Sequence, residues 1–134
     1  MAEVFHRAVH EGSAAHYTAL QRAAWSPTPN PALFCNREAD GRKIWVAEIA
    51  GAVTGFIELE QDGHIDCFYC HPRGAGSALY ATLEAEAGRA QLRVEASDVA
   101  QPFFERRGYE VVAKQVVERA GVPLRNTLMV KPAR

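Results

Sequence analysis

The feature that most constrains the fold of this chain is the stretch 65–87, in which a strand, a glycine-rich turn and a helix follow one another directly. The apolar run 65–70 is typical of a strand, and Pro72 ends it because proline cannot continue a sheet ladder. Two glycines then allow a tight turn and a close approach to a ligand. The helix predicted over 78–87 directs free N–H groups and the positive end of its dipole into that turn. This combination is typical of an anion site, most often one for phosphate.

Hairpin signals on both sides of this stretch predict the rest of the fold. Runs of β-branched and aromatic residues joined by short glycine turns are typical of antiparallel strands, and helical spacing of apolar residues marks the helices. The expected elements are, in order, a strand at 4–9, a helix at 14–24, strands at 44–49, 53–59 and 65–70, a helix at 78–87, a strand at 92–96, a short helix through 103–104, and strands at 111–119 and 124–131. Antiparallel strands followed by one crossover helix indicate an α/β fold with a mixed sheet.

The length and charge of the chain limit its class. With 134 residues, we expect one domain that spans 1–134 and has its own core. The net charge of −1 gives no electrostatic reason to expect nucleic acid or an anionic membrane as a partner. No apolar run is as long as a membrane span, and the N-terminus lacks the apolar core of a signal peptide. We therefore expect a cytoplasmic protein whose three cysteines are reduced.

Two well-known phosphate-binding motifs do not fit the glycine turn. A dinucleotide-binding fold places its glycines after the first strand of a parallel array and needs a third glycine, whereas here three hairpin strands come first. A Walker-type loop needs Gly-Lys followed by Ser or Thr, whereas this chain has Gly76-Ser77 and no lysine there. Residue types and the order of elements exclude both classes.

Two parts of the sequence, one around the glycine turn and one after the strand at 92–96, together form a recognisable pattern. Residues 68–72 read Phe-Tyr-Cys-His-Pro at the end of a strand, and 73–79 read Arg-Gly-Ala-Gly-Ser-Ala-Leu at the start of a helix. Farther along, the strand at 92–96 is followed by Ala-Gln-Pro-Phe-Phe at 100–104 and by Gly-Tyr at 108–109. Over nearly its whole length the chain resembles the GCN5-related N-acetyltransferase (GNAT) family, in which the first of these parts is the acyl-CoA motif.

The resemblance implies a GNAT-like α/β fold, with a mixed, mostly antiparallel central sheet flanked by helices on both faces. It also implies an enzyme that transfers an acetyl group from acetyl-CoA to an amine by direct attack in a ternary complex, without a metal. The acceptor amine can belong to a small molecule or to a peptide. The segments expected to bind it, 14–37 and 117–124, vary within the family and have no charge pattern here that selects one of the two. Dimerisation through the last strands is common in the family, so the resemblance allows a homodimer.

The resemblance also implies which residues hold the cofactor. In the family, the strand that ends at Cys70 splays from the next strand, and its free N–H groups hold pantetheine and polarise the thioester carbonyl. N–H groups of the turn and of the first helical turn cradle the pyrophosphate. Ser97 either caps the short helix or contacts pantetheine, and Phe104 stands where the family often carries a tyrosine that protonates the leaving thiolate. The residues expected to bind acetyl-CoA are Phe68, Tyr69, Cys70, Arg73, Gly74, Ala75, Gly76, Ser77, Ala78, Ser97 and Phe104.

Three ionisable side chains on the strands before the turn are candidates for the general base, namely Glu58, His64 and Asp66. The family often places its acid or a water relay in this region. Period-two spacing predicts His64 and Asp66 on the same strand face as Phe68 and Cys70. The alternative is that these side chains only form a solvated strand face and that the amine loses its proton through ordered water.

Aromatic residues are expected on the other parts of the site. Phe104 cannot act as an acid, so Tyr69 and Tyr109 are the candidates to replace the missing tyrosine, with core packing as the alternative for Tyr109. Catalysis without a tyrosine is also open, because a thiolate whose thiol has a pKa of about 8.5 needs little help to leave. Trp25 and Phe34 flank the proline-rich loop that covers the acceptor site in this family, so both are expected in the substrate pocket.

Two features of the sequence favour other functions. Pro72 joins Arg73 directly, whereas the family usually has several residues between them. The shortened loop and the missing tyrosine make an acyl-CoA-binding module with little or no transferase activity the alternative function. Cys67-x-x-Cys70-His71 also matches the attachment motif for c-type haem. On a strand, however, Cys67 and Cys70 point to opposite faces and cannot jointly hold a metal.

Overall fold

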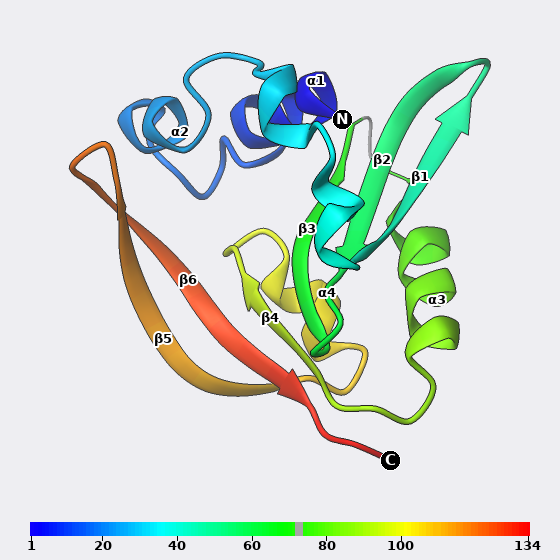
Figure 1. Ribbon diagram of the computed structural model, residues 1–134. Coiled ribbons are helices and arrows are strands. Elements are labelled where there is room, and N and C mark those ends of the chain that lie inside the picture. The colour runs from blue at the N-terminus through cyan, green and yellow to red at the C-terminus, as the bar shows by residue number, and fades with distance from the viewer. Residues whose placement is uncertain (72–73) are drawn as a thin grey trace.

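The computed structural model describes residues 1–71 and 74–134, except for the side chain of Leu33. A six-stranded sheet forms its centre, with the strand order β1-β2-β3-β4-β6-β5 (Figure 1). The strands are β1 (Lys43–Ile49), β2 (Ala52–Leu59), β3 (His64–Cys70), β4 (Leu92–Ala96), β5 (Glu110–Arg119) and β6 (Val122–Lys131). Within the described ranges, β3 and β4 form the one parallel pair, and all other neighbours are antiparallel. The prediction of a mixed, mostly antiparallel sheet is confirmed.

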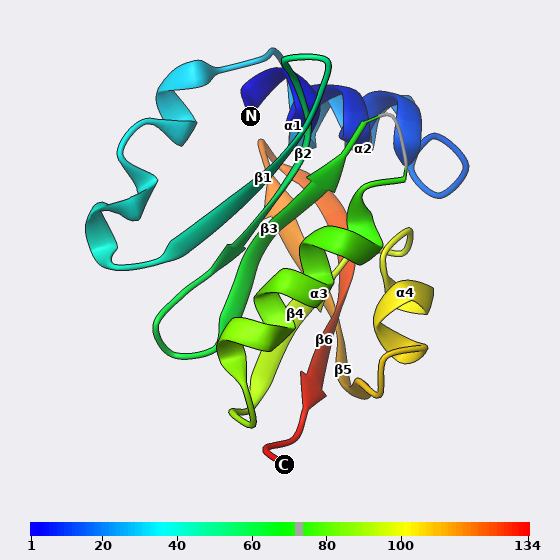
Figure 2. The same ribbon diagram turned by 90° about the vertical axis from the view of Figure 1, so that its right-hand side faces the viewer.

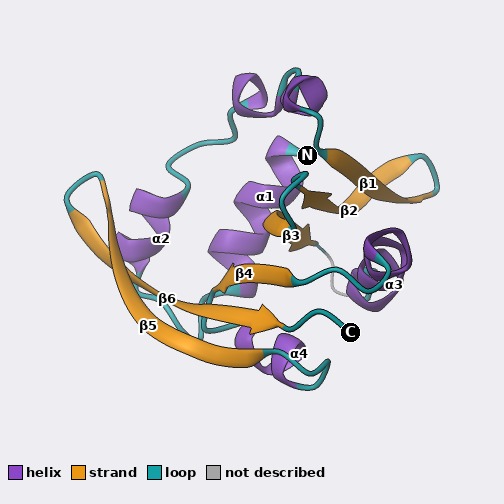
Figure 3. Cartoon of the chain, turned by 60° about the horizontal axis from the view of Figure 1, so that its bottom comes forward, coloured by secondary structure: helices purple, strands orange, loops and turns teal. Residues whose placement is uncertain are grey.

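Helices cover both faces of this sheet, as predicted. One face carries α3 (Gly76–Ala87), which lies across the strands in Figure 2, and α4 (Gln101–Glu105). The other face carries the N-terminal half of the chain, and Figure 3 shows α1 and α4 on opposite sides of β4. The elements of that half are α1 (Ala2–Arg7), the π-helical turn η1 (Ala8–Gly12), α2 (Ala19–Trp25), and the 3-10 turns η2 (Pro31–Phe34) and η3 (Arg37–Asp40).

The core is divided by the sheet into two clusters. Between the sheet and α3 and α4, the main cluster buries aliphatic side chains such as Ile57, Leu83 and Met129, each of which is fully buried. On the opposite face, the rings of Phe5 and Tyr69 meet edge to face with centroids 4.7 Å apart. Neighbouring residues of β2 and β3 therefore pack into different clusters, which fixes the register of both strands.

The predicted strand at 4–9 is wrong, because these residues form α1 and the start of η1. The apolar residues of this stretch recur after four positions, as on one face of a helix, and Val4 and Val9 are buried. Arg7 donates a hydrogen bond to the carboxylate of Glu3 at 2.8 Å, a pair that helical spacing brings together. The helical period therefore decides this segment.

The second helix begins later than predicted. We expected a helix over 14–24, whereas α2 starts at Ala19. Thr18 sets this start through a capping box: its hydroxyl accepts from the N–H of Gln21 at 3.1 Å, and the Gln21 side chain accepts from the N–H of Thr18 at 3.0 Å.

The remaining elements agree with the predicted ones apart from small shifts of their ends. Gly88, with a φ of +63°, ends α3, and its N–H donates to the carbonyl of Glu84 at 3.0 Å. At the sheet edge, β5 exposes Val111, Val112 and Val116. Among the helices described, none has both the length and the apolar composition needed to cross a membrane.

Candidate active site

The strands β3 and β4 diverge soon after they begin, as expected. They pair only at His64 with Arg93 and at Ile65 with Val94. From there β3 continues along β2 as far as Cys70, without β4 beside it. Backbone groups of this part of β3 that face β4 have no strand partner and are available to a ligand.

Two cavities open beside the diverging strands. The larger, of about 540 Å³, lies between η1, the start of α3 and α4, and we call it the groove. The smaller, of about 170 Å³, lies between β3, β4 and the β5–β6 hairpin, and we call it the hairpin cavity. Five residues line both, namely Trp25, Phe68, Tyr69, Ser97 and Ala100. A reactive group held beside Phe68 and Tyr69 is therefore within reach of both cavities.

The start of α3 forms one end of the groove, through Gly74, Gly76 and Ser77. Among bonds between described residues, the N–H of Leu79 is the first of this helix to bond back to the preceding turn, at 3.1 Å, and the first N–H groups of a helix generally lack a partner within it. A Cβ at Gly76 would be in van der Waals contact with Cζ of Phe68, at 3.4 Å, so a larger side chain there would extend beyond this contact. The groove thus ends at the positive end of a twelve-residue helix.

The predicted cofactor residues fall into four groups. Those that line the groove are Phe68, Tyr69, Cys70, Gly74, Gly76, Ser77 and Ser97. Ala75 packs against the core and Ala78 is exposed, and neither side chain lines the groove. Arg73, and with it the junction to Pro72, lies outside the described residues. Phe104 lines the hairpin cavity instead.

Two consecutive arginines after α4 belong to the groove, although the motifs did not indicate them. Arg106 lines it directly. Arg107 donates to the Ser77 hydroxyl at 3.0 Å, and its guanidinium stacks 3.4 Å from the centroid of the Phe103 ring. The pair of basic residues directly after Phe-Phe-Glu was the available sequence signal.

The two predicted substrate-pocket residues have different positions. Trp25 lines both the groove and the hairpin cavity. Phe34 lines neither; its ring contacts those of Phe5 and Phe56, with centroids 5.8 and 5.5 Å away. In this structure Phe34 therefore supports the aromatic cluster beneath the site.

Two of the three candidate bases are held by arginines. Glu58 is fully buried, and Arg37 binds both of its oxygens at 2.7 Å while Arg42 binds one of them at 2.7 Å. Oδ2 of Asp66 accepts from the same two guanidinium groups, also at 2.7 Å. Arg42 further lowers the pKa of Asp40 to about 2 by hydrogen bonding. Glu58 lines neither cavity, whereas Asp66 lines the hairpin cavity.

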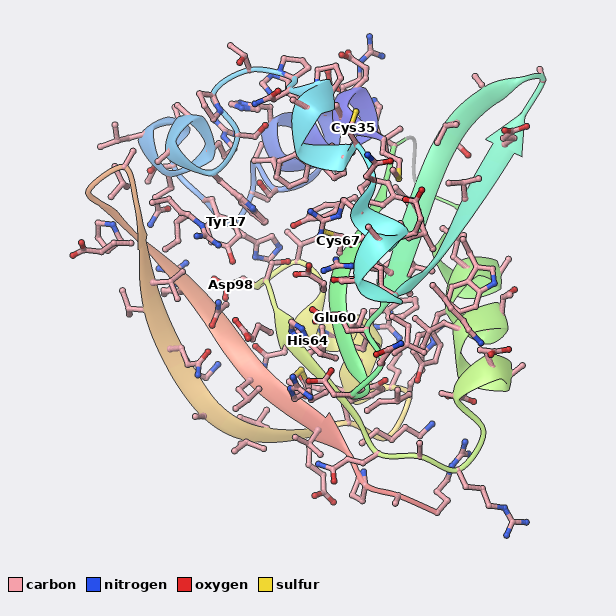
Figure 4. All side chains as sticks on the ribbon, viewed as in Figure 1. Tyr17, Cys35, Glu60, His64, Cys67 and Asp98 are labelled. Atoms are coloured by element: carbon pink, nitrogen blue, oxygen red, sulfur yellow. The ribbon has the colours of Figure 1, made fainter. Side chains whose placement is uncertain are left out.

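His64 is the candidate base with a ring nitrogen on the cavity side. Its Nδ1 lies 2.8 Å from Oε1 of Glu60, and its Nε2 lies 3.7 Å from Oε1 of Glu95. Figure 4 shows His64 and Glu60 next to each other near the start of β3. His64, Asp66 and Glu95 all line the hairpin cavity. Glu60 therefore orients the ring and leaves Nε2 toward the cavity.

A bulge in β3 changes the expected alternation of side chains. Between residues 65 and 68, β3 has one residue more than the facing segment of β2. Asp66 and Cys67 consequently both lie against the buried carboxylate of Glu58. The prediction that His64 and Asp66 share a strand face with Phe68 is wrong, because period two does not hold across a bulge.

Cys67 and Cys70 lie on opposite faces of β3, as predicted. Sγ of Cys67 lies 3.5 Å from Nη2 of Arg37, and burial raises the pKa of this thiol. Sγ of Cys70 lies on the side of α3, where a Cβ on Gly55 would meet it at 2.9 Å and Leu79 at 3.0 Å. The Cys-x-x-Cys-His spacing therefore does not direct two thiols to one ligand.

The tyrosines proposed as substitutes for Phe104 differ in access. Tyr109 is buried, accepts a hydrogen bond from the Tyr80 hydroxyl at 3.0 Å and lines neither cavity; burial raises its pKa to about 12. Tyr69 lines both cavities. Burial raises the pKa of Tyr69, and nearby Trp25 and Arg119 partly oppose that rise. Tyr109 therefore packs in the core, which was the alternative to a catalytic role. Of these two tyrosines, Tyr69 is the one that lines the cavities.

The far wall of the hairpin cavity includes residues of 14–37 and 117–124, the variable segments expected at the acceptor site, but the sequence singled out none of its polar residues. Ser97, for which a role was predicted, accepts from the N–H of Ala100 at 3.2 Å and still lines both cavities, so capping and ligand contact are compatible. The unassigned polar residues are Tyr17, Glu95, Arg119, Arg125 and Asn126. No local motif marks them, because they lie on four separate elements and loops.

Comparisons with known proteins agree with this geometry. A family model described as an acetyltransferase (GNAT) domain matches residues 13–130. The uncharacterized N-acetyltransferase YafP of Escherichia coli is 33% identical over 130 residues, which cover 94% of this chain and 83% of YafP.

Solved structures share the fold. A GCN5-related N-acetyltransferase from Rhodopseudomonas palustris superposes with a TM-score of 0.86 at 33% identity, covering 98% of this chain and 86% of that one. PaiA N-acetyltransferase from Thermoplasma acidophilum, solved in complex with coenzyme A, gives a TM-score of 0.73 at 17% identity, covering 98% and 89%. The family match over most of the chain, together with these relatives, shows that this protein belongs to the GNAT family of N-acetyltransferases.

Proposed function

We propose that this protein transfers the acetyl group of acetyl-CoA to an amine by direct attack in a ternary complex. The observation that carries the proposal is the pair of cavities that share the wall of Phe68 and Tyr69. A thioester that enters from the groove presents its carbonyl there, and an amine in the hairpin cavity faces it. Family membership and the coenzyme A complex of PaiA, a protein of the same fold, support this assignment.

The groove is proposed to hold the cofactor mainly through backbone groups. The N–H groups at the start of α3, at Gly76 and Ser77, suit the pyrophosphate, because a helix N-terminus favours anions. Arg106 adds a positive charge to the same groove. The backbone groups of 68–70 that face away from β2 would hold pantetheine and donate to the carbonyl oxygen as negative charge develops on it, which is worth about 3 kcal/mol for one well-placed donor.

The hairpin cavity is proposed to prepare the amine. His64 would take the proton that the ammonium must lose, with Glu60 orienting its ring at 2.8 Å. The nitrogen lone pair then attacks the carbonyl carbon, the C–S bond breaks, and the second proton of the nitrogen passes to the departing CoA thiolate to give the free thiol. Asp66 lines the same cavity but has Oδ2 engaged by two arginines, so we assign it a supporting role.

Calorimetry with acetyl-CoA, followed by release of free thiol in the presence of an amine panel, tests this proposal. We expect binding and acceptor-dependent thiol release. Absence of binding at millimolar acetyl-CoA would refute the acetyltransferase assignment. Binding without thiol release from any amine would favour the acyl-CoA-binding module, the alternative suggested by the direct junction of Pro72 with Arg73.

A further inference from the structure

The charged side chains of the hairpin cavity are divided between two walls. His64, Asp66 and Glu95 come from β3 and β4, and Arg119 and Arg125 come from the β5–β6 hairpin. One wall is therefore acidic and the other is basic. A ligand that fills the cavity meets both signs of charge.

On the acidic wall, the group left for a ligand is Glu95. The charge of Asp66 is already matched by Arg37 and Arg42. Glu95 has a side chain that is 48% exposed and lies 3.7 Å from the His64 ring. An ammonium group therefore finds its counter-charge at Glu95, directly beside the nitrogen that is proposed to take its proton.

On the basic wall, the group left for a ligand is Arg119. Arg125 is paired with Asp98 at 2.8 Å and also donates to the carbonyl of His16 at 3.2 Å. Arg119, at the end of β5, is exposed and forms no ion pair within the described part of the chain. Arg119 lines the same cavity as Tyr69, one of the residues that the hairpin cavity and the groove share.

Asn126 adds a buried polar atom beside this cavity and beside a second one that lies between α4 and the β5–β6 hairpin. Its Oδ1 is buried and has no hydrogen-bond partner in the described residues, and its side chain lines the cavity wall. Buried polar atoms are normally paired, so an orphan oxygen at a cavity indicates a missing donor. An amine or amide N–H of an acceptor is such a donor.

From this arrangement we infer that the acceptor is a small amino acid-like molecule that carries a carboxylate as well as its amine. The inference rests on the proposed function and adds the substrate class. The ammonium lies toward Glu95 and His64, and the carboxylate pairs with the guanidinium of Arg119, a group suited to planar oxyanions. A polyamine fits this cavity poorly, because its second positive charge would face Arg119. The cavity volume of about 170 Å³ also suits a molecule of this size.

Matched acceptors test the inference on the acetyl-CoA-loaded protein. The probes are alanine, alaninamide and ethylamine, with 4-aminobutyrate and propylamine as a longer pair, each compared at equal concentration of free amine. We expect kcat/KM for the carboxylate to exceed that for its amide or plain amine by at least about 10-fold, the effect of one charge-assisted pair. Arg119→Gln should raise KM for the carboxylate and bring the ratio close to one. Arg89→Gln, an exposed arginine that lines neither cavity, should keep the ratio.

The outcomes separate the inference from the function on which it rests. Equal turnover of carboxylates, amides and plain amines, or a ratio that survives Arg119→Gln, would overturn the inference while the thiol release itself upholds the acetyltransferase. A higher turnover of a dipeptide amide with a free N-terminal amine than of alanine would overturn the inference as well. If acetyl-CoA binds but no amine releases thiol, calorimetric titration of the CoA-loaded protein with alanine and alaninamide still decides. Tighter binding of alanine that Arg119→Gln abolishes supports the inference, and equal binding contradicts it.

Discussion

The groove and the hairpin cavity are built in different ways. The groove joins the free edge of β3 and the start of α3, which carry the acyl-CoA motif of the sequence, to residues of η1 and of the segment around α4. The hairpin cavity is made of side chains that converge from β3, β4, the hairpin and the N-terminal segment. Substitutions in the groove should therefore act through volume, whereas substitutions in the hairpin cavity should act through chemical identity.

The largest expected effect is that of His64→Gln. Glutamine keeps a polar side chain beside Glu60 but cannot take the proton of the ammonium. We expect kcat to fall by about 100-fold or more, the usual contribution of a positioned general base. The Kd for acetyl-CoA should stay within about twofold, because His64 does not line the groove. Steady-state kinetics and calorimetry measure the two quantities.

Two further variants check the assignment of the base. His6→Gln changes a histidine that lines neither cavity and should leave kcat unaltered. Asp66→Asn should cost less activity than His64→Gln. A larger loss of kcat for Asp66→Asn would transfer the role of base to Asp66.

Gly76→Val tests the other half of the comparison. A Cβ at this position would already lie 3.4 Å from the Phe68 ring and 3.8 Å from the Phe103 ring, so the added methyl groups must enter the groove. We expect acetyl-CoA to bind about 100-fold more weakly, equivalent to about 2.7 kcal/mol. Ala78→Val, in the same helical turn but exposed, is the matched control and keeps its N–H. Similar losses of affinity for both variants would show that helix propensity and not groove volume is responsible.

Arg37→Met should affect the free energy of unfolding and leave the groove intact. It removes two of the hydrogen bonds to the buried carboxylate of Glu58 and leaves Arg42 to balance that charge. We expect a loss of about 2 kcal/mol in denaturant unfolding, since an incompletely paired buried charge is costly. Arg7→Met, which breaks an exposed pair, should cost less than about 1 kcal/mol. Equal effects of the two substitutions would contradict a stabilising role for the buried network.

The same contrast explains what the sequence could and could not predict. The groove could be predicted in part because the glycines that follow β3 leave a local motif in the sequence. The mixed sheet follows from the succession of hairpins and one crossover helix, whereas the splay of β3 from β4 was implied by the resemblance to the family. The prediction of a first strand was wrong because the segment is short. Its apolar residues recur after four positions, as in a helix, but so few residues do not separate this period from that of a strand.

The hairpin cavity was only partly predictable. Three candidate bases were named on adjoining strands, but the bulge at Asp66 and Cys67 alters which face each one occupies. The arginines that neutralise Glu58 lie sixteen and twenty-one residues away in an irregular segment without a periodic signal. Arg119 and Asn126 belong to a hairpin whose sequence reads as ordinary β-structure. Side chains that meet only through tertiary packing leave no spacing by which to recognise them.

The smallest expected effect concerns Phe104, where the two regions meet. Its ring is buried, packs against Tyr109 with centroids 4.9 Å apart and lines the hairpin cavity, so we expect the hydroxyl added by Phe104→Tyr to reach the edge of that cavity. There it can donate a proton to the leaving thiolate, and we expect kcat to rise by about threefold, equivalent to less than 1 kcal/mol in the barrier. Tyr109→Phe is the control, because Tyr109 lines neither cavity and its loss should not change kcat. An unchanged kcat in Phe104→Tyr would show that the thiolate leaves without help, as its low basicity allows.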